Sequence, residues 1–391
     1  MNNTTDKKVN LTEAHNQWAN RPMDQRFTNV EDFLNHLRLR QRNSYEREAM
    51  TDEMRVHHDD DALYLNGRTT KAELTNWSGG QLCQRMGAPA SYLRKLPNER
   101  AADLLNYHLQ DMPASKYNVM FYEKPNYDVS GGATYTTQAI TTEHYGRIFD
   151  ADVATAIVDM NERTGNKFRN PVAYANGQFG AELEGAGLYA SDRDMFMFMI
   201  DGGDRLDVGD RAKLHRGFFA SNSEVGNSSL VLKFFLFNEV CGNNIVWGAQ
   251  NITEFRMRHS KFAPTRFVNK AEPSLLEFIN ASGNREAEVI KRAMEYKLPE
   301  RSVLASSSQD DEWWQSLYSG RNAQFTKGEV QSAIDMAELE EGQCETLWDL
   351  EQGFTAHARM KAHIDARIDL ETRAGKLLNI VRDSSTAVLT A

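Results

Sequence analysis

The sequence has few cysteines and no long apolar run, and each shortage excludes a class of protein. Its three cysteines, Cys83, Cys241 and Cys344, lie far apart and form neither a CxxC motif nor a zinc-ligand spacing. No apolar run approaches the roughly 18 residues of a membrane helix, and the polar start lacks the apolar core of a signal peptide. We therefore expect a cytoplasmic protein with free thiols and no membrane partner.

Motifs for nucleotide cofactors and metals are also missing. The chain contains no P-loop, no GxGxxG and no GxSxG. The densest group of candidate metal ligands runs from His57 to Asp61. Because consecutive side chains point in different directions, a solvated acidic turn is the better interpretation. The sequence thus predicts no cofactor and no metal site.

A catalytic centre has one candidate set of polar residues. Ser221, Ser223 and Glu224 precede Cys241 and His259 in the chain. A nucleophile and its base would have to meet in space, which one sequence does not establish. Polar residues at strand ends more often satisfy backbone groups. We therefore predict no catalytic residue and a protein that is not an enzyme.

What is present is enough apolar sequence to fold. Apolar residues make up 40% of 391 residues, and a chain of this length exceeds a single ordinary core. We predict an α+β fold with a mainly antiparallel sheet core, flanked by N- and C-terminal helical segments. The expected divisions are a flexible arm (1–27), an N-terminal helical region (28–112), a central α+β core (113–303), and an acidic hinge with C-terminal helices (304–391).

Local patterns place the elements within these divisions. Thr28 and Glu31 have the spacing of a capping box, which predicts a helix from there through residue 48, with arginines such as Arg40 on its solvated face. Alternation and β-branched residues predict strands, and another helix is expected from Thr346 through Val381. The predicted strands are 134–142, 181–190, 195–201, 214–221 and 230–241.

Two of these strands carry further information. Residues 195–200 alternate methionine and phenylalanine, so both strand faces are apolar. This strand is therefore central or lies in a subunit interface, which leaves a homo-oligomer open. Lys233 lies inside an apolar strand, where a side chain that extends toward solvent is favoured over a functional one.

The net charge of −10 is unevenly distributed. Residues 309–351 contain eleven acids and two bases, whereas residues 205–270 contain ten bases and five acids. The chain therefore combines a basic middle with an acidic appendage, and its overall charge does not argue against a polyanionic partner.

The basic middle is the strongest candidate site. Its predicted nucleic-acid-binding residues are Arg256, Arg258, His259, Lys261, Arg266, Lys270, Lys213 and Arg216. Phe255, Phe262 and Phe267 interleave with them, and cations with exposed rings bind single-stranded nucleic acid. In an extended segment Arg256 and Arg258 share one face. The alternative is that the three rings are core residues and that the arginines lie on the solvent-exposed side of the same segment.

The acidic appendage contains Trp313, Trp314, Tyr318 and Phe325. Acids with aromatics could cover a basic groove in competition with nucleic acid, dock a host or phage protein, or pack internally. The predicted partner-binding residues are Trp313, Trp314 and Tyr318.

Three blocks in order resemble a known family. They span residues 139–161, 187–206 and 215–248, and a fourth segment, 256–267, follows. With the Asn222-Ser-Glu-Val-Gly226 motif, the Cys241-Gly-Asn243 motif and the Arg258-His259 pair, they are similar to the phage- and plasmid-related family containing domain of unknown function 932. The resemblance implies a compact α+β core and a gene on a mobile element, and it supplies no catalytic residues.

Together these patterns favour a non-enzymatic mobile-element protein that binds nucleic acid, in single-stranded form, during replication or recombination. The alternative is an interaction protein that modulates a host factor or defence system through the acidic segment. An enzyme of unknown reaction is the third hypothesis.

Overall fold

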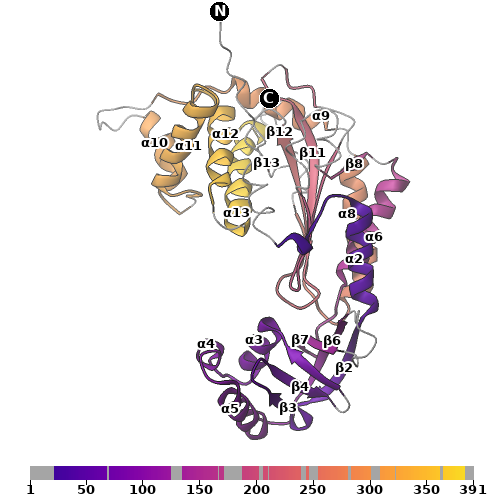
Figure 1. Ribbon diagram of the computed structural model, residues 1–391. Coiled ribbons are helices and arrows are strands. Elements are labelled where there is room, and N and C mark those ends of the chain that lie inside the picture. The colour runs from indigo at the N-terminus through magenta and orange to yellow at the C-terminus, as the bar shows by residue number, and fades with distance from the viewer. Residues whose placement is uncertain are drawn as a thin grey trace, which may run out of the picture.

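The computed structural model contains two β-sheets, one near the N-terminus and one in the middle of the chain (Figure 1). It describes residues 22–67, 70–124, 134–165, 167–170, 187–201, 206–209, 211–238, 244–245, 254–280, 283–300, 309–321, 323–361 and 364–383. Helices accompany both sheets, so the predicted α+β class is confirmed.

The N-terminal sheet has the strand order β2-β6-β7-β5-β4-β3. Its pairs are antiparallel except for the parallel pair β5–β7. Its strands are β2 (Ser44–Met50), β3 (Arg55–His58), β4 (Leu63–Gly67), β5 (Thr70–Leu74), β6 (Lys116–Lys124) and β7 (Thr134–Thr142). Leu82, Leu105 and Phe121 are buried where the helices of this unit meet the sheet. Those helices are α3 (Asn76–Arg85), α4 (Ala90–Leu93) and α5 (Asn98–Asp111).

The first long helix differs from its prediction at both ends. Helix α2 (Val30–Arg42) is capped by Asn29, whose side chain accepts from the Asp32 amide, and not by Thr28. Residues 44–50 form β2 instead of continuing the helix, because they pair along their whole length with β6. Residues 28–112 therefore contain strands β2 to β5 as well as the expected helices.

The middle sheet follows the order β1-β9-β10-β11-β12-β13, with β8 on β10 and β14 on β12. Its strands are β1 (Arg26–Phe27), β8 (Phe168–Arg169), β9 (Leu188–Ala190), β10 (Met195–Asp201), β11 (Leu214–Asn222), β12 (Leu230–Asn238), β13 (Asn244–Ile245) and β14 (Glu254–Met257). The prediction for β10 is confirmed, and the strand is central with both faces almost wholly buried. Of the predicted strands 181–190 and 230–241, residues 181–186 and 239–241 lie outside the described residues.

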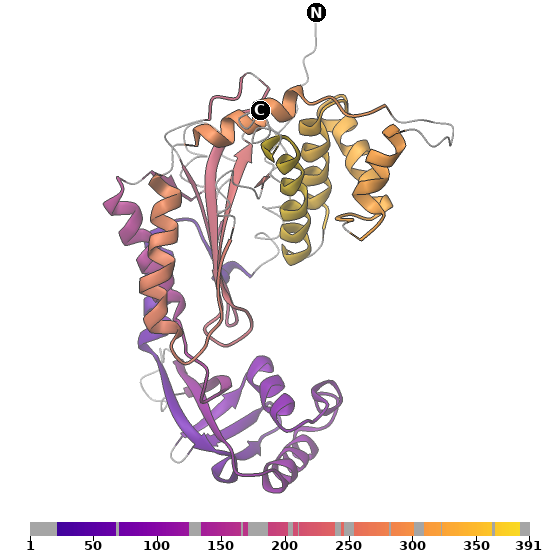
Figure 2. The same cartoon turned by 180° about the vertical axis from the view of Figure 1, so that it is seen from behind.

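Helices cover the two faces of this sheet differently. Helices α2, α6 (Asp150–Arg163) and α8 (Ala263–Asn280) lie side by side along one face, where Met197, Phe218 and Phe267 share a core (Figures 1 and 2). Helix α13 (Ile364–Gly375) lies toward the other face, since Lys233 of β12 donates to its Thr372.

The C-terminal helices share a core with Leu214 and Leu236 of the middle sheet. They are α9 (Asn284–Glu295), α10 (Gln309–Tyr318), α11 (Lys327–Glu340), α12 (Leu347–Arg359), α13 and the short α14 (Asn379–Asp383). Helix α12 begins directly after Thr346, which caps it through a capping box with Asp349, but the single helix predicted from Thr346 through Val381 is divided among α12, α13 and α14. Trp348 and Phe354 of α12 are fully buried. At Gly353 a side chain would collide with the Ala333 carbonyl, so glycine lets α11 and α12 approach closely.

Candidate nucleic-acid interface and the polar joint

The predicted basic segment begins on an edge strand. Strand β14 pairs with β12, placing Arg256 opposite Val231. Arg256 and Arg258 are exposed, Met257 is buried and Phe255 is partly buried. The expected alternation of exposed cations and inward apolar residues is therefore present.

Beyond β14 the segment turns into α8 and presents a second basic surface. Lys261, Phe262, Arg266 and Lys270 are all exposed. The Arg266 amide donates to the Phe262 carbonyl, so the helical turn already includes Phe262. Phe262 is 61% exposed, an unusual position for a large ring. We name these four residues the α8 basic surface.

The cations of this surface have no acidic partner within the described part of the chain. There, no ion pair involves Lys261, Arg266 or Lys270, and the same holds for the neighbouring Arg258. Elsewhere on the described surface many cations are paired, for example Lys291 with Asp207 at 3.1 Å. A surface of unpaired cations around an exposed ring attracts a polyanion.

The other two rings of the segment belong to the core. Phe267 is buried and Phe255 packs partly against the same cluster on the α2, α6 and α8 side of the sheet. The core interpretation is therefore right for these two residues, and only Phe262 is free to contact a ligand.

Three further predicted residues lie apart from the α8 basic surface. Lys213 is exposed before β11. Arg216 is buried on β11, and its burial lowers the pKa of the guanidinium, while Glu286 and Asp201 oppose that shift. His259 is mostly buried and stacks on Tyr145, with ring centroids 5.0 Å apart. Burial lowers the pKa of His259 to about 4, so its ring is neutral at physiological pH.

Arg256 points to a cavity on the opposite face of the middle sheet. The cavity has a volume of about 560 Å³. Its lining residues are Asp194, Phe196, Phe219, Ser221, Asn227, Ser228, Ser229, Val231, Lys233, Arg256 and Asp369. We call it the sheet cavity. The structure therefore divides the predicted basic segment between this cavity and the α8 basic surface.

Near one end of the sheet cavity, the turn after β11 joins the two sheets. Its motif, Asn222 to Gly226, is buried up to Val225, and Gly226 adopts a φ of +83° that glycine accommodates. The Val225 carbonyl accepts hydrogen bonds from Trp77 Nε1 and Gln81 Nε2 of α3, at 3.0 and 2.8 Å. A turn of the middle sheet is thus held by the N-terminal unit.

Glu224 is the centre of this joint. Its Oε1 accepts from Arg40 Nη2 of α2 at 3.0 Å, and its Oε2 accepts from the Asp150 amide at 3.2 Å. Its backbone carbonyl accepts from Arg147, whose Nε also donates to Glu46 of β2 at 2.9 Å. We call Glu224, Arg40, Arg147, Asp150 and Asn222 the polar joint.

Asp150 is the second carboxyl of the joint and is fully buried. Asn222 Nδ2 donates to its Oδ1 at 2.8 Å. Burial, and then the nearby Glu224 carboxylate, raise the pKa of Asp150 well above its ordinary value. The raised pKa favours the neutral form of Asp150, which reduces the repulsion between the two carboxyls in this enclosed site.

The sequence contained one signal for this joint, and the solvated-face interpretation of Arg40 was wrong. Phe33, Leu37 and Arg40 follow the i, i+4, i+7 spacing of one helix face, and the first two are buried. Arg40 therefore points inward with the apolar stripe.

Of the candidate catalytic set, Glu224 belongs to the joint, and the described Ser223 and His259 lie beside it with backbone partners. Tyr145, which stacks on His259, donates from its hydroxyl to the Ser223 carbonyl at 3.0 Å. The Ser223 hydroxyl donates to the Arg193 carbonyl and accepts from the Asn227 amide. His259 Nδ1 faces the Gly146 carbonyl at 3.3 Å. Cys241 lies outside the described residues.

The acidic aromatic segment packs internally for the most part. Trp314 of α10 is buried and its Nε1 donates to the Pro299 carbonyl at 3.0 Å. Phe325 is also buried and stacks on Phe354 at 4.0 Å. Trp313 and Tyr318 are partly buried against the same core. Of the three predicted partner-binding residues, Trp314 is thus occupied by packing.

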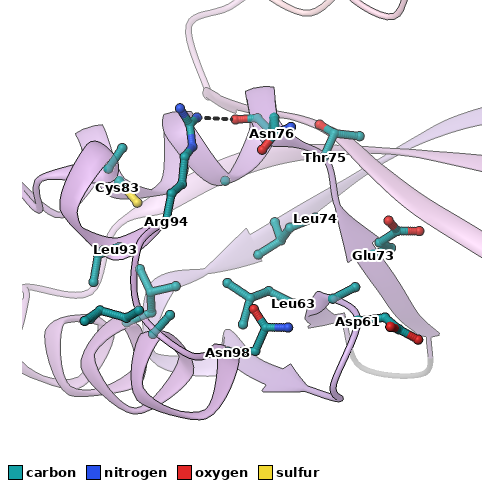
Figure 3. A pocket seen from close by; sticks show the side chains of 16 residues that line it. Asp61, Leu63, Glu73, Leu74, Thr75, Asn76, Cys83, Leu93, Arg94 and Asn98 are labelled. Carbon is teal, nitrogen blue, oxygen red and sulfur yellow. Dashed lines mark hydrogen bonds between the residues drawn. The ribbon is translucent and has the colours of Figure 1, made fainter.

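A further cavity of about 410 Å³ lies in the N-terminal unit (Figure 3). Leu63, Leu74, Leu93 and Cys83 make part of its lining apolar, while Arg94 donates to the Asn76 carbonyl at 2.7 Å. Burial raises the pKa of the Cys83 thiol, which disfavours the reactive thiolate.

The predicted acidic turn borders that cavity through Asp61. His57 and His58 end β3, and Asp59 accepts hydrogen bonds from the Asp61 and Ala62 amides. Among the residues that the structure describes, no group of three or more potential ligands is arranged to hold a metal ion. None of the described helices is both long enough and apolar enough to cross a membrane.

Comparison with known proteins identifies a family for this chain. The family described as Domain of unknown function (DUF932) matches residues 167–383, more than half of the chain. The matched region contains most of the middle sheet, α8 and the C-terminal helices, and it leaves out the N-terminal sheet. No curated protein and no solved structure matches this chain.

Proposed function

The chain belongs to the family defined by this domain of unknown function, and we propose that it binds single-stranded nucleic acid, without catalysis, through the α8 basic surface. The biological setting of this proposal is replication or recombination of a phage- or plasmid-type mobile element. The observation that carries the proposal is Phe262, exposed among cations that have no acidic partner within the described residues.

The geometry favours a single strand over a duplex. Arg266 and Lys270 are four residues apart on α8, so they project from one helix face, and Phe262 precedes Arg266 by the same interval. Cations in this arrangement neutralise successive phosphates, while an exposed ring stacks on an unpaired base of any sequence. A duplex offers phosphates to the same cations but no free base face to Phe262.

The protein-docking alternative has weaker support. Trp314 is enclosed by the C-terminal core, and Trp313 and Tyr318 pack against that core. The same packing argues against the alternative in which the acidic segment detaches from the core and competes with nucleic acid for a basic groove. It instead supports a structural role for α10 and α11.

The proposal is tested by fluorescence anisotropy with labelled single- and double-stranded DNA at several salt concentrations. The triple variant Lys261→Gln, Arg266→Gln, Lys270→Gln should bind at least tenfold more weakly, and the salt slope should fall by about 0.7 for each lost phosphate contact. A control triple variant, Lys95→Gln, Arg100→Gln, Lys376→Gln, changes the net charge equally at exposed sites away from α8. Equal affinities for the two triple variants would refute the assigned surface.

Phe262→Ala tests the stacking step separately. It should weaken binding to single-stranded DNA by roughly fivefold to a hundredfold and leave the weaker duplex binding unchanged. Tyr107→Ala, which removes a ring that is 64% exposed on α5, is the matched control. Absence of any DNA binding by the folded wild-type protein would reject the function itself.

A further inference from the structure

We infer that the cavity of the N-terminal unit binds a small apolar carboxylic acid, with the carboxylate on Arg94 and the apolar body over the leucine side chains of the lining. The inference goes beyond the proposed function and is independent of it, because none of the residues of the α8 basic surface lines this cavity. The cavity also lies outside residues 167–383, in the part of the chain that the family match leaves out.

The body of the cavity is apolar and is built by both the sheet and the helices of the unit. Leu63 comes from β4, Leu74 from β5 and Leu105 from α5, while Leu93 and Leu96 come from the segment between α3 and α5. Leu63, Leu74 and Leu96 are only partly buried, although they pack against the core of the unit. A ligand with an apolar body gains free energy here, because it removes the exposed leucine surface from water.

Helix α3 leaves room for a ligand at Gly79. Two consecutive glycines, Gly79 and Gly80, lie inside this helix, where each is less favourable than alanine. Gly80 has a packing reason, since an added Cβ would lie 3.2 Å from Arg94 Nη2. Gly79 lines the cavity, and among the described residues nothing beyond its own helix backbone lies within 4 Å of an added Cβ. The missing side chain at Gly79 therefore keeps the cavity open without serving an internal contact.

One end of the cavity is positively charged. Arg94 lies beside the start of α3, where its Nη2 donates to the Asn76 carbonyl at 2.7 Å (Figure 3). Within the described part of the chain no carboxylate pairs with Arg94, so most of its five N–H donors remain for a ligand. The first turn of α3 contains no acidic residue, so the positive end of the helix dipole adds to the potential of Arg94.

The carboxylates of the lining lie at the other end. Figure 3 shows Asp61 and Glu73 on the opposite side of Leu63 and Leu74 from Arg94. Lys124 Nζ pairs with Glu73 at 2.9 Å, which balances the charge of that acid. A ligand anion is therefore attracted toward Arg94 and repelled by Asp61, which fixes its direction in the cavity.

The size and charge of the cavity define the class of ligand. Its volume of about 410 Å³ lies within the roughly 300 to 1,000 Å³ of small-ligand sites. Arg94 is the single cation of the described lining, so it matches a monoanion and not a phosphate dianion. The planar guanidinium fork also fits the two oxygens of a carboxylate. One carboxylate on an apolar body occurs in a free acid and at the C-terminus of an apolar peptide, and the probes below distinguish these sources.

Isothermal titration calorimetry with the full-length protein tests the inference. Sodium octanoate, octan-1-ol and octyltrimethylammonium share a chain and differ in charge, and acetyl-Ala-Leu-Leu offers the same carboxylate at a peptide C-terminus. We expect octanoate to bind at least tenfold more tightly than octan-1-ol, because of its charge-assisted hydrogen bonds. Octyltrimethylammonium should bind more weakly than octan-1-ol, and the peptide more weakly than octanoate.

Two pairs of variants locate the site. Arg94→Gln should weaken octanoate binding about tenfold and leave octan-1-ol binding unchanged. Arg100→Gln, which removes the same charge from exposed α5 surface outside the cavity, should change neither. Gly79→Leu fills the cavity with a side chain and should abolish binding of both probes. Gly328→Leu in α11, where an added Cβ also meets nothing within 4 Å, is its control and should change neither.

The results that would overturn the inference are distinct. Equal affinities for octanoate and octan-1-ol, tighter binding of octyltrimethylammonium, or equal effects of Arg94→Gln and Arg100→Gln would refute the anionic end. Octanoate binding that persists in Gly79→Leu, or no octanoate binding to the wild type, would refute the cavity as the site. A peptide that binds more tightly than octanoate would replace the free acid by a chain terminus. DNA affinity should stay at the wild-type value in Gly79→Leu, which separates this site from the α8 basic surface.

Discussion

Arg40 and Glu224, 184 residues apart in sequence, form an ion pair of 3.0 Å that joins α2 to the turn after β11. The Glu224 side chain is 3% exposed and that of Arg40 is 13% exposed. The pair lies beside Asp150 and Arg147, so its charges are balanced within a polar network instead of by water. Its removal therefore tests how firmly α2 is held to the turn after β11.

We expect Glu224→Gln to lower the free energy of unfolding by about 3 to 5 kcal/mol, because it leaves Arg40 enclosed without its partner. The double variant Arg40→Met, Glu224→Gln should lose less than the sum of the two single variants. Urea unfolding of the four proteins measures this coupling. Strict additivity would contradict a direct interaction between the two residues.

Glu351 of α12 gives the fold a pH dependence. Burial is the main cause that raises its pKa to about 8, and Glu371 and Glu341 add to the shift. The unfolded carboxyl, with a pKa near 4.5, releases its proton first as pH rises, so the folded state binds more protons between about pH 4.5 and 8. The stability contribution of this group therefore falls across that window and is constant above it.

Glu351→Gln keeps the shape and removes the titration. It should raise the free energy of unfolding at pH 8 by several kcal/mol, on the order of 4 at most, and leave it nearly unchanged at pH 4.5. Urea unfolding at both pH values provides the measurement. A variant that is less stable than the wild type at pH 8 would show that the buried carboxylate is needed in its charged form.

Alanine variants of Trp313 and Trp314 test whether the acidic segment packs in the core or docks a partner. Trp314→Ala should destabilise the protein by about 3 to 5 kcal/mol, since it opens a large void and removes the bond to Pro299. Trp313→Ala should lower the free energy of unfolding clearly less, because Trp313 is only partly buried. Thermal unfolding of the pair tests this order. Two equally mild losses would restore the hypothesis of a docking segment.

Gly146 is required by a close backbone approach. A Cβ atom there would lie 2.0 Å from the Ser260 carbonyl oxygen, so Gly146→Ala must displace one of the two segments, at a cost of about 1 to 3 kcal/mol. Gly79→Ala in α3 is the control, because nothing lies within 4 Å of its added methyl group and alanine favours a helix. In chemical denaturation, the free energy of unfolding should be lower for Gly146→Ala than for the wild type. For Gly79→Ala it should equal or exceed that of the wild type.

The sequence predicted best where local pattern and tertiary environment agree. Residues 195–200 are apolar on both faces, and they lie in the central strand that such a pattern requires. The helix expected from Thr346 likewise begins there, where Thr346 and Asp349 form a capping box. These elements need no information from distant parts of the chain.

The errors arise where neighbouring residues compete or distant ones decide. Thr28 and Asn29 are both good caps with an acid three residues later, and Asn29 prevails because its side chain also reaches Asp32, with a donor–acceptor distance of 2.6 Å. Residues 44–50 contain helix formers, yet β6, 66 to 78 residues away in the chain, supplies a strand partner for each.

The sequence located the candidate nucleic-acid interface only in part, because the exposure of each residue also depends on distant parts of the chain. Density of charge indicates residues 256–270, but exposure separates Phe262 from Phe255 and Phe267 only in three dimensions. The polar joint could not be assembled from one sequence, because Glu224 finds its partners 74 to 184 residues away. Arginine is a residue type that often binds phosphate, but Arg216 is buried in the core.

The approach of Gly146 to Ser260 has a mechanical consequence. Tyr145 and Ser260 form an isolated bridge, and α8 begins three residues after Ser260, while Arg147 lies two residues after Tyr145. The start of α8 is thus fixed against residues 145–147, the segment that leads from β7 to the polar joint. Because Arg147 of the same segment donates to Glu46 of β2, a displacement at the start of α8 would be passed on to the N-terminal sheet.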